Sequence, residues 1–304
     1  MLKAAARLFR IRQLWTIALY EVNRENDIFN LGSLKPFHFI GERGLRTSRR
    51  YQSTVADPFL FTHGEMLFVF YEVKTEFSPG EIHAQSMDAS GRFTNLGLVL
   101  KEPFHLSYPQ VFSYDGSVWM IPEAAASGKV WLYRAEDFPG GWVKERVLID
   151  EVLVDTSLVV QEDGIYLLGT TRSHELKLYH AFSLQEKFEW TGVTVTSDRA
   201  YSRNAGRPLR IDGNLFRLSQ NCKITYGENI SIHKVQKLTV TSYAEVLFIP
   251  NLFLKKPTWM ALGHHHISVA TFTGRHFVAV DGMRPDKFIN SLTLVPLKIG
   301  ARHA

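Results

Sequence analysis

Cysteine is almost absent from this sequence of 304 residues, which contains only Cys222. No intrachain disulfide and no cysteine-based zinc cluster can form, and the scarcity of cysteine favours a reducing compartment. Long apolar runs are also missing, because no stretch approaches the roughly 20 apolar residues of a transmembrane helix. Arg7, Arg10 and Arg12 interrupt the apolar residues near the N-terminus, unlike the core of a secretory signal. We therefore expect a cytoplasmic protein.

Several familiar cofactor motifs are absent as well. The sequence has no phosphate-binding loop, no dinucleotide-binding glycine fingerprint and no nucleophile elbow, so we expect no cofactor. The formal net charge of +5 is a small excess. Such an excess is compatible with phosphates, acidic sugars or anionic lipids, and it does not indicate nucleic acid.

The N-terminal residues 1–13 combine basic and apolar side chains. If this segment is helical, Lys3, Arg7 and Arg10 lie on one side, and Leu8, Ile11 and Trp15 lie towards the other. The segment could then lie on an anionic membrane surface, peripheral to the inner membrane face. The alternative is a frayed basic terminus.

Strand, turn, strand units repeat along the chain, whose composition of 45% hydrophobic and 12% aromatic residues suits a large core. The five units are ADPFLFTHGEMLFVFYE from Ala56, SYPQVFSYDGSVWMIPEA from Ser107, VDTSLVVQEDGIYLLGTT from Val154, RNAGRPLRIDGNLFRLSQN from Arg203 and HHHISVATFTGRHFVAVDG from His264.

Each unit has a turn glycine, and the turns read HG, DG, DG, DG and TG at Gly64, Gly116, Gly164, Gly213 and Gly274. Glycine between alternating apolar residues is a strong hairpin signal, because glycine adopts positive φ without steric cost. Further strand-like pieces would complete each unit as a four-stranded blade. We predict an all-β protein, with residues 31–304 as a single five-bladed β-propeller and residues 1–30 as an N-terminal extension and first strand. Two stacked β domains are the alternative.

In a propeller, the innermost strand of each blade lines the central channel. Both ends of a hairpin opposite its turn lie at one mouth of that channel. Polar residues at these ends should therefore converge, although a slip of one residue would reverse the facing of a strand. The predicted pocket includes His105, Tyr108 and Glu123 from the second blade.

Carboxylates at this mouth suggest glycosidic chemistry. Such chemistry needs one group to protonate the leaving oxygen and another to activate water or attack the anomeric carbon. The candidates are Asp57, Glu123 and Asp155, with Glu72 in reserve. As alternatives, Asp57 could merely start a turn before a proline, and Glu123 could pair with a structural arginine such as Arg134.

Cationic and amide side chains are predicted to contact a ligand. Arg203, Asn204 and Arg207 in the RNAGRP segment suit recognition of a carboxylate or phosphate. Alternatively, these arginines pair with the axial carboxylates themselves. Donors and an aromatic platform for a sugar come from Gln220, Asn221 and Tyr226.

Three successive histidines, His264, His265 and His266, raise the question of a metal site. Successive side chains of a strand point to opposite faces, so the three cannot comfortably bind one ion. We therefore expect no metal, and we expect either His265 or His266 to hydrogen-bond the substrate.

The motifs ADPFLF, GEIHAQS, EPFHLSYPQVF, WMIPEA, RNAGRP, RLSQNC and HHHIS, followed by VDG, occur in order over roughly residues 50–285. On these motifs the chain resembles the N-terminal domain family of glucosamine inositolphosphorylceramide transferase. That domain is similar to the five-bladed propellers of arabinanase, invertase and levansucrase type glycoside hydrolases. The resemblance implies that Asp57 is the base or nucleophile. Those enzymes also carry an Asp in the second blade and a Glu in the third. This sequence departs from them, with Tyr108 in the second blade and Asp155 in the third, so Glu123 would be the acid.

The sequence therefore predicts a carbohydrate-active protein that hydrolyses or transfers a glycosyl group on an acidic or phosphorylated glycan or glycoconjugate. In the plant relatives the transferase activity is associated with a separate C-terminal domain, so activity does not follow from the resemblance alone. The alternative is a non-catalytic glycan-binding propeller that serves a partner glycosyltransferase in polysaccharide or glycolipid assembly. A third possibility is a propeller that binds proteins on its blade rims.

Overall fold

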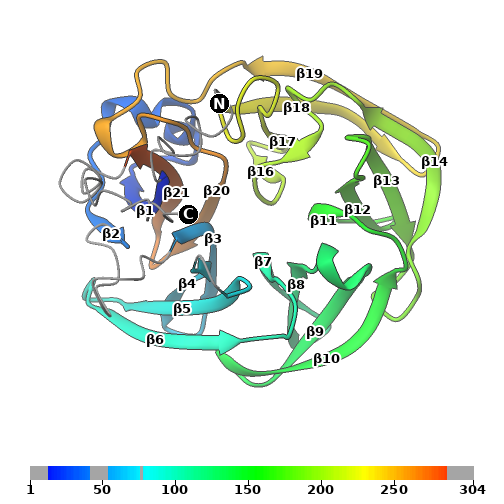
Figure 1. Ribbon diagram of the computed structural model, residues 1–304, viewed down its shortest axis with the longest axis horizontal. Coiled ribbons are helices and arrows are strands. Elements are labelled where there is room, and N and C mark those ends of the chain that lie inside the picture. Colours follow the sequence, from blue (N-terminus) through cyan, green and yellow to red (C-terminus); the bar gives the residue numbers. More distant parts are fainter. Residues whose placement is uncertain (1–12, 42–53, 76–77, 286–304) are drawn as a thin grey trace, which may run out of the picture.

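The computed structural model describes residues 13–41, 54–75 and 78–285. Five antiparallel sheets stand in a ring around a central axis (Figure 1), which confirms the predicted five-bladed β-propeller. Within the described ranges, no helix has the length and apolar character needed to cross a membrane. The predicted membrane-facing segment lies almost entirely in residues 1–12, outside the described residues.

The first four blades follow one another along the chain, each starting with its innermost strand. The first contains β3 (Thr54–His63), β4 (Met66–Lys74), β5 (Glu81–Asp88) and β6 (Phe93–Leu100). The second contains β7 (Ser107–Tyr114), β8 (Ser117–Glu123), β9 (Val130–Asp137) and β10 (Gly140–Ile149). The third contains β11 (Val154–Gln161), β12 (Gly164–Thr170), β13 (Leu176–Ala181) and β14 (Glu189–Thr196). The fourth contains β15 (Arg203–Asn204), β16 (Leu209–Ile211), β17 (Asn214–Gln220), β18 (Ile230–Thr239) and β19 (Ser242–Ile249).

The fifth blade joins the two ends of the chain. Its inner strands are β20 (Ile267–Phe272) and β21 (Arg275–Pro285), and its outer strands are β1 (Gln13–Val22) and β2 (His38–Ile40). Strand β1 pairs with β21 from Gln13 opposite Pro285 to Val22 opposite His276. Strand β1, from the segment 1–30 that we expected to hold an N-terminal extension and first strand, lies within this blade and closes the ring. Three 3₁₀ helices complete the described elements: η1 (Glu25–Ser33), η2 (Ala125–Ser127) and η3 (Thr258–Met260).

All five predicted hairpins are present. The Asp115–Gly116 turn has φ of +48° and +72°, as the type I′ geometry of two-residue hairpins requires. In the first blade, however, His63 pairs with Met66, so Gly64 is the first residue of the turn. In the third blade Gln161 pairs with Gly164, so the glycine directly follows the turn. Alignment of the blades on their glycines therefore shifts these two blades relative to the others.

A β-bulge recurs near the start of the inner strand in three successive blades. At each bulge two residues of the inner strand oppose one residue of the second strand. The first residue of each bulge is Asp57, Tyr108 or Asp155, and its φ is +55°, +49° and +49°, respectively. Positive φ costs about 1 kcal/mol or more for a residue with a Cβ atom, and a bulge turns a side chain away from the regular alternation. The repeat therefore places three strained residues at equivalent positions around the axis.

The hydrophobic core lies in the seams between blades. Phe70 of the first blade packs in one cluster with Val111 of the second, and Ile121 of the second packs with Leu158 of the third. Leu19 of β1 packs with Leu60 of the first blade. Because apolar residues fill the seams, the polar residues near the axis are left at the channel mouth.

Candidate functional site

A cavity of about 480 Å³ opens at the channel mouth where the inner strands begin. Eight of the predicted residues line its wall: Asp57, Glu72, His105, Glu123, Asp155, Arg203, Tyr226 and His265. The other six lie outside this wall: Tyr108, Asn204, Arg207, Gln220, Asn221 and His266. The repeat thus brings together the carboxylates predicted to act chemically, but only part of the set predicted to bind ligand.

The carboxylates come from two repeated positions in the blades. Asp57 and Asp155 are bulge residues of inner strands. Glu72 and Glu123 are at the ends of second strands, opposite Ala56 and Ser107, which directly precede the bulges. Both positions are at the mouth, so a five-fold repeat of one hairpin gathers several acids at a single axis.

These carboxylates also connect neighbouring blades. Asp281 Oδ2 accepts a hydrogen bond from the Asp57 backbone N–H at 3.1 Å, and Asp57 Oδ2 accepts one from the Tyr108 N–H at 3.2 Å. Glu123 Oε2 likewise accepts from the Asp155 N–H at 3.2 Å. The bulges free these N–H groups from the strand ladders, and the acids of adjacent blades satisfy them.

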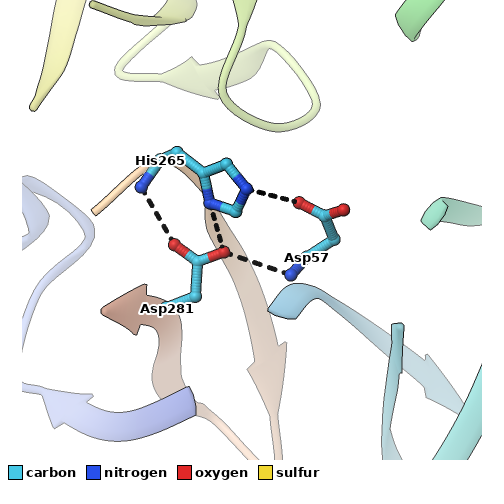
Figure 2. Close-up of side chains that lie close together, drawn as sticks. All are labelled: Asp57, His265 and Asp281. Carbon is cyan, nitrogen blue, oxygen red and sulfur yellow. Dashed lines mark hydrogen bonds and ion pairs between the residues drawn. The ribbon is translucent and has the colours of Figure 1, made fainter. Parts of the chain in front are cut away.

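His265 lies between two aspartates (Figure 2). Its Nδ1 is 2.6 Å from Asp281 Oδ2, and its Nε2 is 3.5 Å from Asp57 Oδ1. Burial lowers the pKa of His265, but the carboxylates of Asp281 and Asp57 outweigh burial and raise it to about 9. Burial raises the pKa of Asp57 to about 7 against the attraction of His265. Asp57 is therefore an ionisable group near neutral pH, next to a cationic imidazole.

Asp57, His265 and Asp281 each offer one ligand atom, and these atoms lie within 4.8 Å of one another. Their geometry is that of a hydrogen-bonded group. Asp281 Oδ1 also accepts the backbone N–H groups of His265 and His266 at 3.0 and 2.9 Å. A divalent cation could bind here only by replacing the short bond between His265 and Asp281.

The three successive histidines have separate surroundings, although they lie just before β20 and not in a strand as we expected. His264 Nε2 accepts a hydrogen bond from the Ile230 N–H, and its ring packs against Phe253. His266 packs against Phe59 and Tyr108. Only His265 of the three lines the cavity.

Asp155 already has protein partners. Arg203 donates to Asp155 Oδ2 through Nε at 2.6 Å, and Gln220 Nε2 donates to the same oxygen at 2.8 Å. Arg203 therefore pairs with an axial carboxylate, which is one of the two interpretations of the RNAGRP segment. Asn204 Nδ2 donates to the backbone oxygens of Asp155 and Leu168, so this amide supports the bulge.

Glu123 does not have the structural partner considered above, because Arg134 bonds with Glu145 and Glu136 instead. Burial, and then the charge of Asp155, raise the pKa of Glu123 well above its ordinary value. The protonated form of Glu123 is therefore favoured. Glu123 and the ionisable Asp57 line the same cavity.

Glu72 and His105 form a second pair at the mouth, with 3.5 Å between Glu72 Oε1 and His105 Nε2. Burial raises the pKa of Glu72 to about 8 and lowers that of His105 to about 4. His105 Nδ1 accepts a hydrogen bond from the Gly80 N–H, so the neutral ring carries its proton on Nε2, towards Glu72.

Tyr108 is buried and lies outside the cavity wall. Its hydroxyl is 2.7 Å from Ser157 Oγ and accepts a hydrogen bond from the Gly206 N–H at 2.8 Å. These bonds join the second, third and fourth blades. The hydroxyl therefore links blades and does not face the cavity.

Trp15, Lys74 and Asp281 contribute to the site, although none of them was predicted from the sequence to have a role there. Trp15 was expected on the apolar side of an N-terminal helix and instead belongs to strand β1. Trp15 lines the wall from β1, and its ring centroid is 4.1 Å from that of His265. Lys74 lines the wall from the end of β4, and Asp281 orients His265 from β21. The alternating apolar residues of QLWTIALYEV could have revealed β1, whereas its pairing with the other end of the chain has no local signal.

Comparison with known proteins gives sequence relatives for most of the chain. The family described as glucosamine inositolphosphorylceramide transferase 1, N-terminal, matches residues 45–283. Glucosamine inositolphosphorylceramide transferase 1 of Oryza sativa subsp. japonica is 37% identical over 249 residues, covering 76% of this chain and 33% of the relative. The Arabidopsis thaliana protein of the same name is 33% identical over 247 residues, covering 76% of this chain and 32% of the relative. The chain thus spans about one third of the length of these curated relatives.

Solved structures share the fold at low sequence identity. The catalytic domain of a GH62 alpha-L-arabinofuranosidase from Coprinopsis cinerea aligns with a TM-score of 0.57 at 13% identity, covering 78% of this chain and 94% of that domain. A GH43_1 enzyme from Xanthomonas citri complexed with xylose aligns with a TM-score of 0.56 at 14% identity, covering 76% and 86%. At these identities the likeness concerns the fold alone.

Proposed function

Because the chain belongs to the glucosamine inositolphosphorylceramide transferase 1 N-terminal family, we propose that its axial cavity binds a sugar and carries out glycosyl hydrolysis or transfer. The observation that supports this proposal most is that two carboxyl groups with raised pKa values line one cavity. Asp57, with a pKa of about 7, can accept a proton near neutral pH, and the raised pKa of Glu123 favours its protonated form. Such a pair can supply a base and an acid.

In the proposed reaction, Glu123 donates its proton to the leaving glycosidic oxygen. Asp57 either takes a proton from the attacking water or acceptor hydroxyl, or attacks the anomeric carbon itself. Asp155 raises the pKa of Glu123 and is held in place by Arg203. Trp15 and Tyr226 add aromatic surface to the wall, which suits the apolar face of a sugar.

The preference for an acidic or phosphorylated glycan stays a prediction. Arg203 gives this preference less support than the sequence implied, because the carboxylate of Asp155 compensates the charge of Arg203. Arg207 lies outside the cavity wall. Lys74 is the cationic side chain of the wall that remains to recognise an anion. Membrane contact through residues 1–12 and a cytoplasmic location also stay predictions.

The second candidate function is glycan recognition without catalysis, in the service of a glycosyltransferase. One observation favours it: the chain matches one third of its curated relatives, so the activity in their names can reside in the other two thirds. The same cavity would then hold the sugar, and its acids would act as hydrogen-bond partners.

The test is a screen of glycans and nucleotide sugars, neutral and acidic, against the wild type, Asp57→Asn and Glu123→Gln. Binding and any released or transferred sugar are read by mass spectrometry. Both substitutions keep an oxygen that can accept the neighbouring backbone N–H, so the blade contacts survive. We expect turnover to fall by about 10² to 10⁴-fold in each variant while sugar binding is retained.

Glu65→Gln is the matched control, because Glu65 is exposed in the turn at the opposite end of the first blade. It should leave turnover unchanged. Sugar binding by all four proteins without product from any of them would exclude the catalytic proposal and support recognition. Equal turnover in wild type and both variants would remove Asp57 and Glu123 from the mechanism.

A further inference from the structure

Two apolar side chains project from the cavity rim at the fourth blade. Ile224 is 81% exposed and Leu254 is 95% exposed. Ile224 lies in the loop between β17 and β18, two residues before Tyr226, which lines the cavity. Leu254 lies in the loop between β19 and β20, which leads to His265. Both loops are therefore at the mouth end of the propeller.

The structure connects these two loops to each other. Lys256 Nζ donates a hydrogen bond to the backbone oxygen of Glu228, and the Leu252 N–H donates to the backbone oxygen of Ile230 at 2.9 Å. The loop before β15 adjoins them, because the Cys222 N–H bonds to the backbone oxygen of Arg199. The three loops form one continuous rim, residues 197–202, 221–229 and 250–266, which we call the blade-four rim.

Cations flank the projecting apolar residues. Lys223 directly precedes Ile224, Lys255 directly follows Leu254, and both lysines are exposed. The blade-four rim has four Lys and Arg residues, Arg199, Lys223, Lys255 and Lys256, against two acids, Asp198 and Glu228. Its net charge is positive even without the histidines.

Apolar loop tips with adjacent lysines match the chemistry of an anionic lipid surface. The apolar side chains enter the boundary between head groups and acyl chains, and each nearby cation is attracted by the negative surface. A protein partner would instead favour a contiguous patch with aromatic anchors. We propose that the blade-four rim docks on an anionic lipid bilayer, with Leu254 and Ile224 inserted and Lys223 and Lys255 against the head groups.

This docking goes beyond the proposed function and does not depend on it. Because the cavity opens at the same end as the blade-four rim, docking turns the cavity mouth towards the head-group layer. A sugar carried on a lipid would then lie closer to Asp57 and Glu123 than a sugar free in solution.

The test is sedimentation of the full chain with vesicles of phosphatidylcholine, with and without phosphatidylserine. We expect binding that requires phosphatidylserine and weakens with salt. The variants Ile224→Ser/Leu254→Ser and Lys223→Glu/Lys255→Glu should each reduce partitioning by about tenfold or more. All four positions are exposed, so thermal unfolding should show that the variants remain folded.

The matched control is Phe182→Ser, because Phe182 is 74% exposed in the loop after β13, at the opposite end of the propeller. It should bind vesicles as the wild type does. The basic residues Lys3, Arg7 and Arg10 stay in place in every variant, so their contribution is constant. Unchanged partitioning of both double variants, or no binding of the wild type to anionic vesicles, would overturn the proposal. Capture of a protein instead of vesicles by the blade-four rim would do the same.

Discussion

His265 Nδ1 lies 2.6 Å from Asp281 Oδ2 in a site where neither side chain is appreciably exposed. This short charged hydrogen bond fixes the orientation of the imidazole and directs its Nε2 towards Asp57. Asp281 is itself held by three backbone N–H groups, those of Asp57, His265 and His266. The fifth blade thus supplies the positive charge that opposes the effect of burial on the pKa of Asp57.

His265→Gln should raise the pKa of Asp57 above about 7, because the variant removes the nearby positive charge that lowers it. The measurement is a carbon-13 NMR titration of the Asp57 carboxyl group. If the protein is an enzyme, the rising limb of its pH profile for kcat/KM should move to higher pH by the same amount. His63→Gln, an exposed histidine at the far end of β3, is the control. An unchanged or lower Asp57 pKa would contradict the role assigned to His265.

Glu72→Gln should make the stability less sensitive to rising pH between about 4.5 and 8. Burial raises the pKa of Glu72 from 4.5 to about 8, so between these values the folded state holds a proton that the unfolded state releases. The free energy of unfolding must then decrease as pH rises through this window. The variant lacks this group, and its slope should be shallower by up to about 1.4 kcal/mol per pH unit. Urea unfolding of both proteins across the window measures the slopes, and equal slopes would refute the shift.

Tyr108→Phe should destabilise the protein without weakening sugar binding. The variant loses the bond to Ser157 and leaves the Gly206 N–H without its acceptor, which costs about 1 to 3 kcal/mol. Thermal unfolding and glycan titration of the same sample separate the two effects. Lower affinity at full stability would instead support the ligand contact predicted for Tyr108 from the sequence.

Gly206→Ala should be among the more damaging small substitutions near the axis. An added Cβ would lie 2.0 Å from the Ile267 backbone oxygen, and φ at this position is +135°. We expect a loss of about 2 to 3 kcal/mol or more. Gly213→Ala is the control, because its φ is also positive, at +74°, but nothing lies within 4 Å of its added Cβ. Similar losses in the two variants would show that backbone strain, not the clash, dominates.

Much of the blade architecture could be predicted from local patterns. A two-residue hairpin needs only neighbouring residues and a turn that accepts positive φ, so five such signals at regular spacing revealed five blades. Asp57, Tyr108 and Asp155 each lie six residues before the last residue of their inner strand, which is His63, Tyr114 and Gln161. Their distances to the turn glycines Gly64, Gly116 and Gly164 are seven, eight and nine residues, so alignment on glycine located the mouth carboxylates only to within one or two positions.

The same alignment could not say which way a side chain points. Bulges change the facing of residues after the turn-based register has been assigned, and a bulge depends on contacts between blades. Even at one bulge position the outcome depends on the side chain: the hydroxyl of Tyr108 reaches into the blade junction, while Asp57 and Asp155, at the equivalent positions, line the cavity.

Contacts between distant segments account for the remaining features. The closure of the ring by β1 depends on pairing Gln13 with Pro285, and no short-range pattern selects a partner so far along the chain. That closure delivers Trp15 to the cavity and packs it on His265. The compensation of Asp155 by Arg203 likewise joins the third and fourth blades. Local sequence was sufficient for the hairpins and the acids they carry, whereas the identity of each acid's partner depends on how the blades meet around the axis.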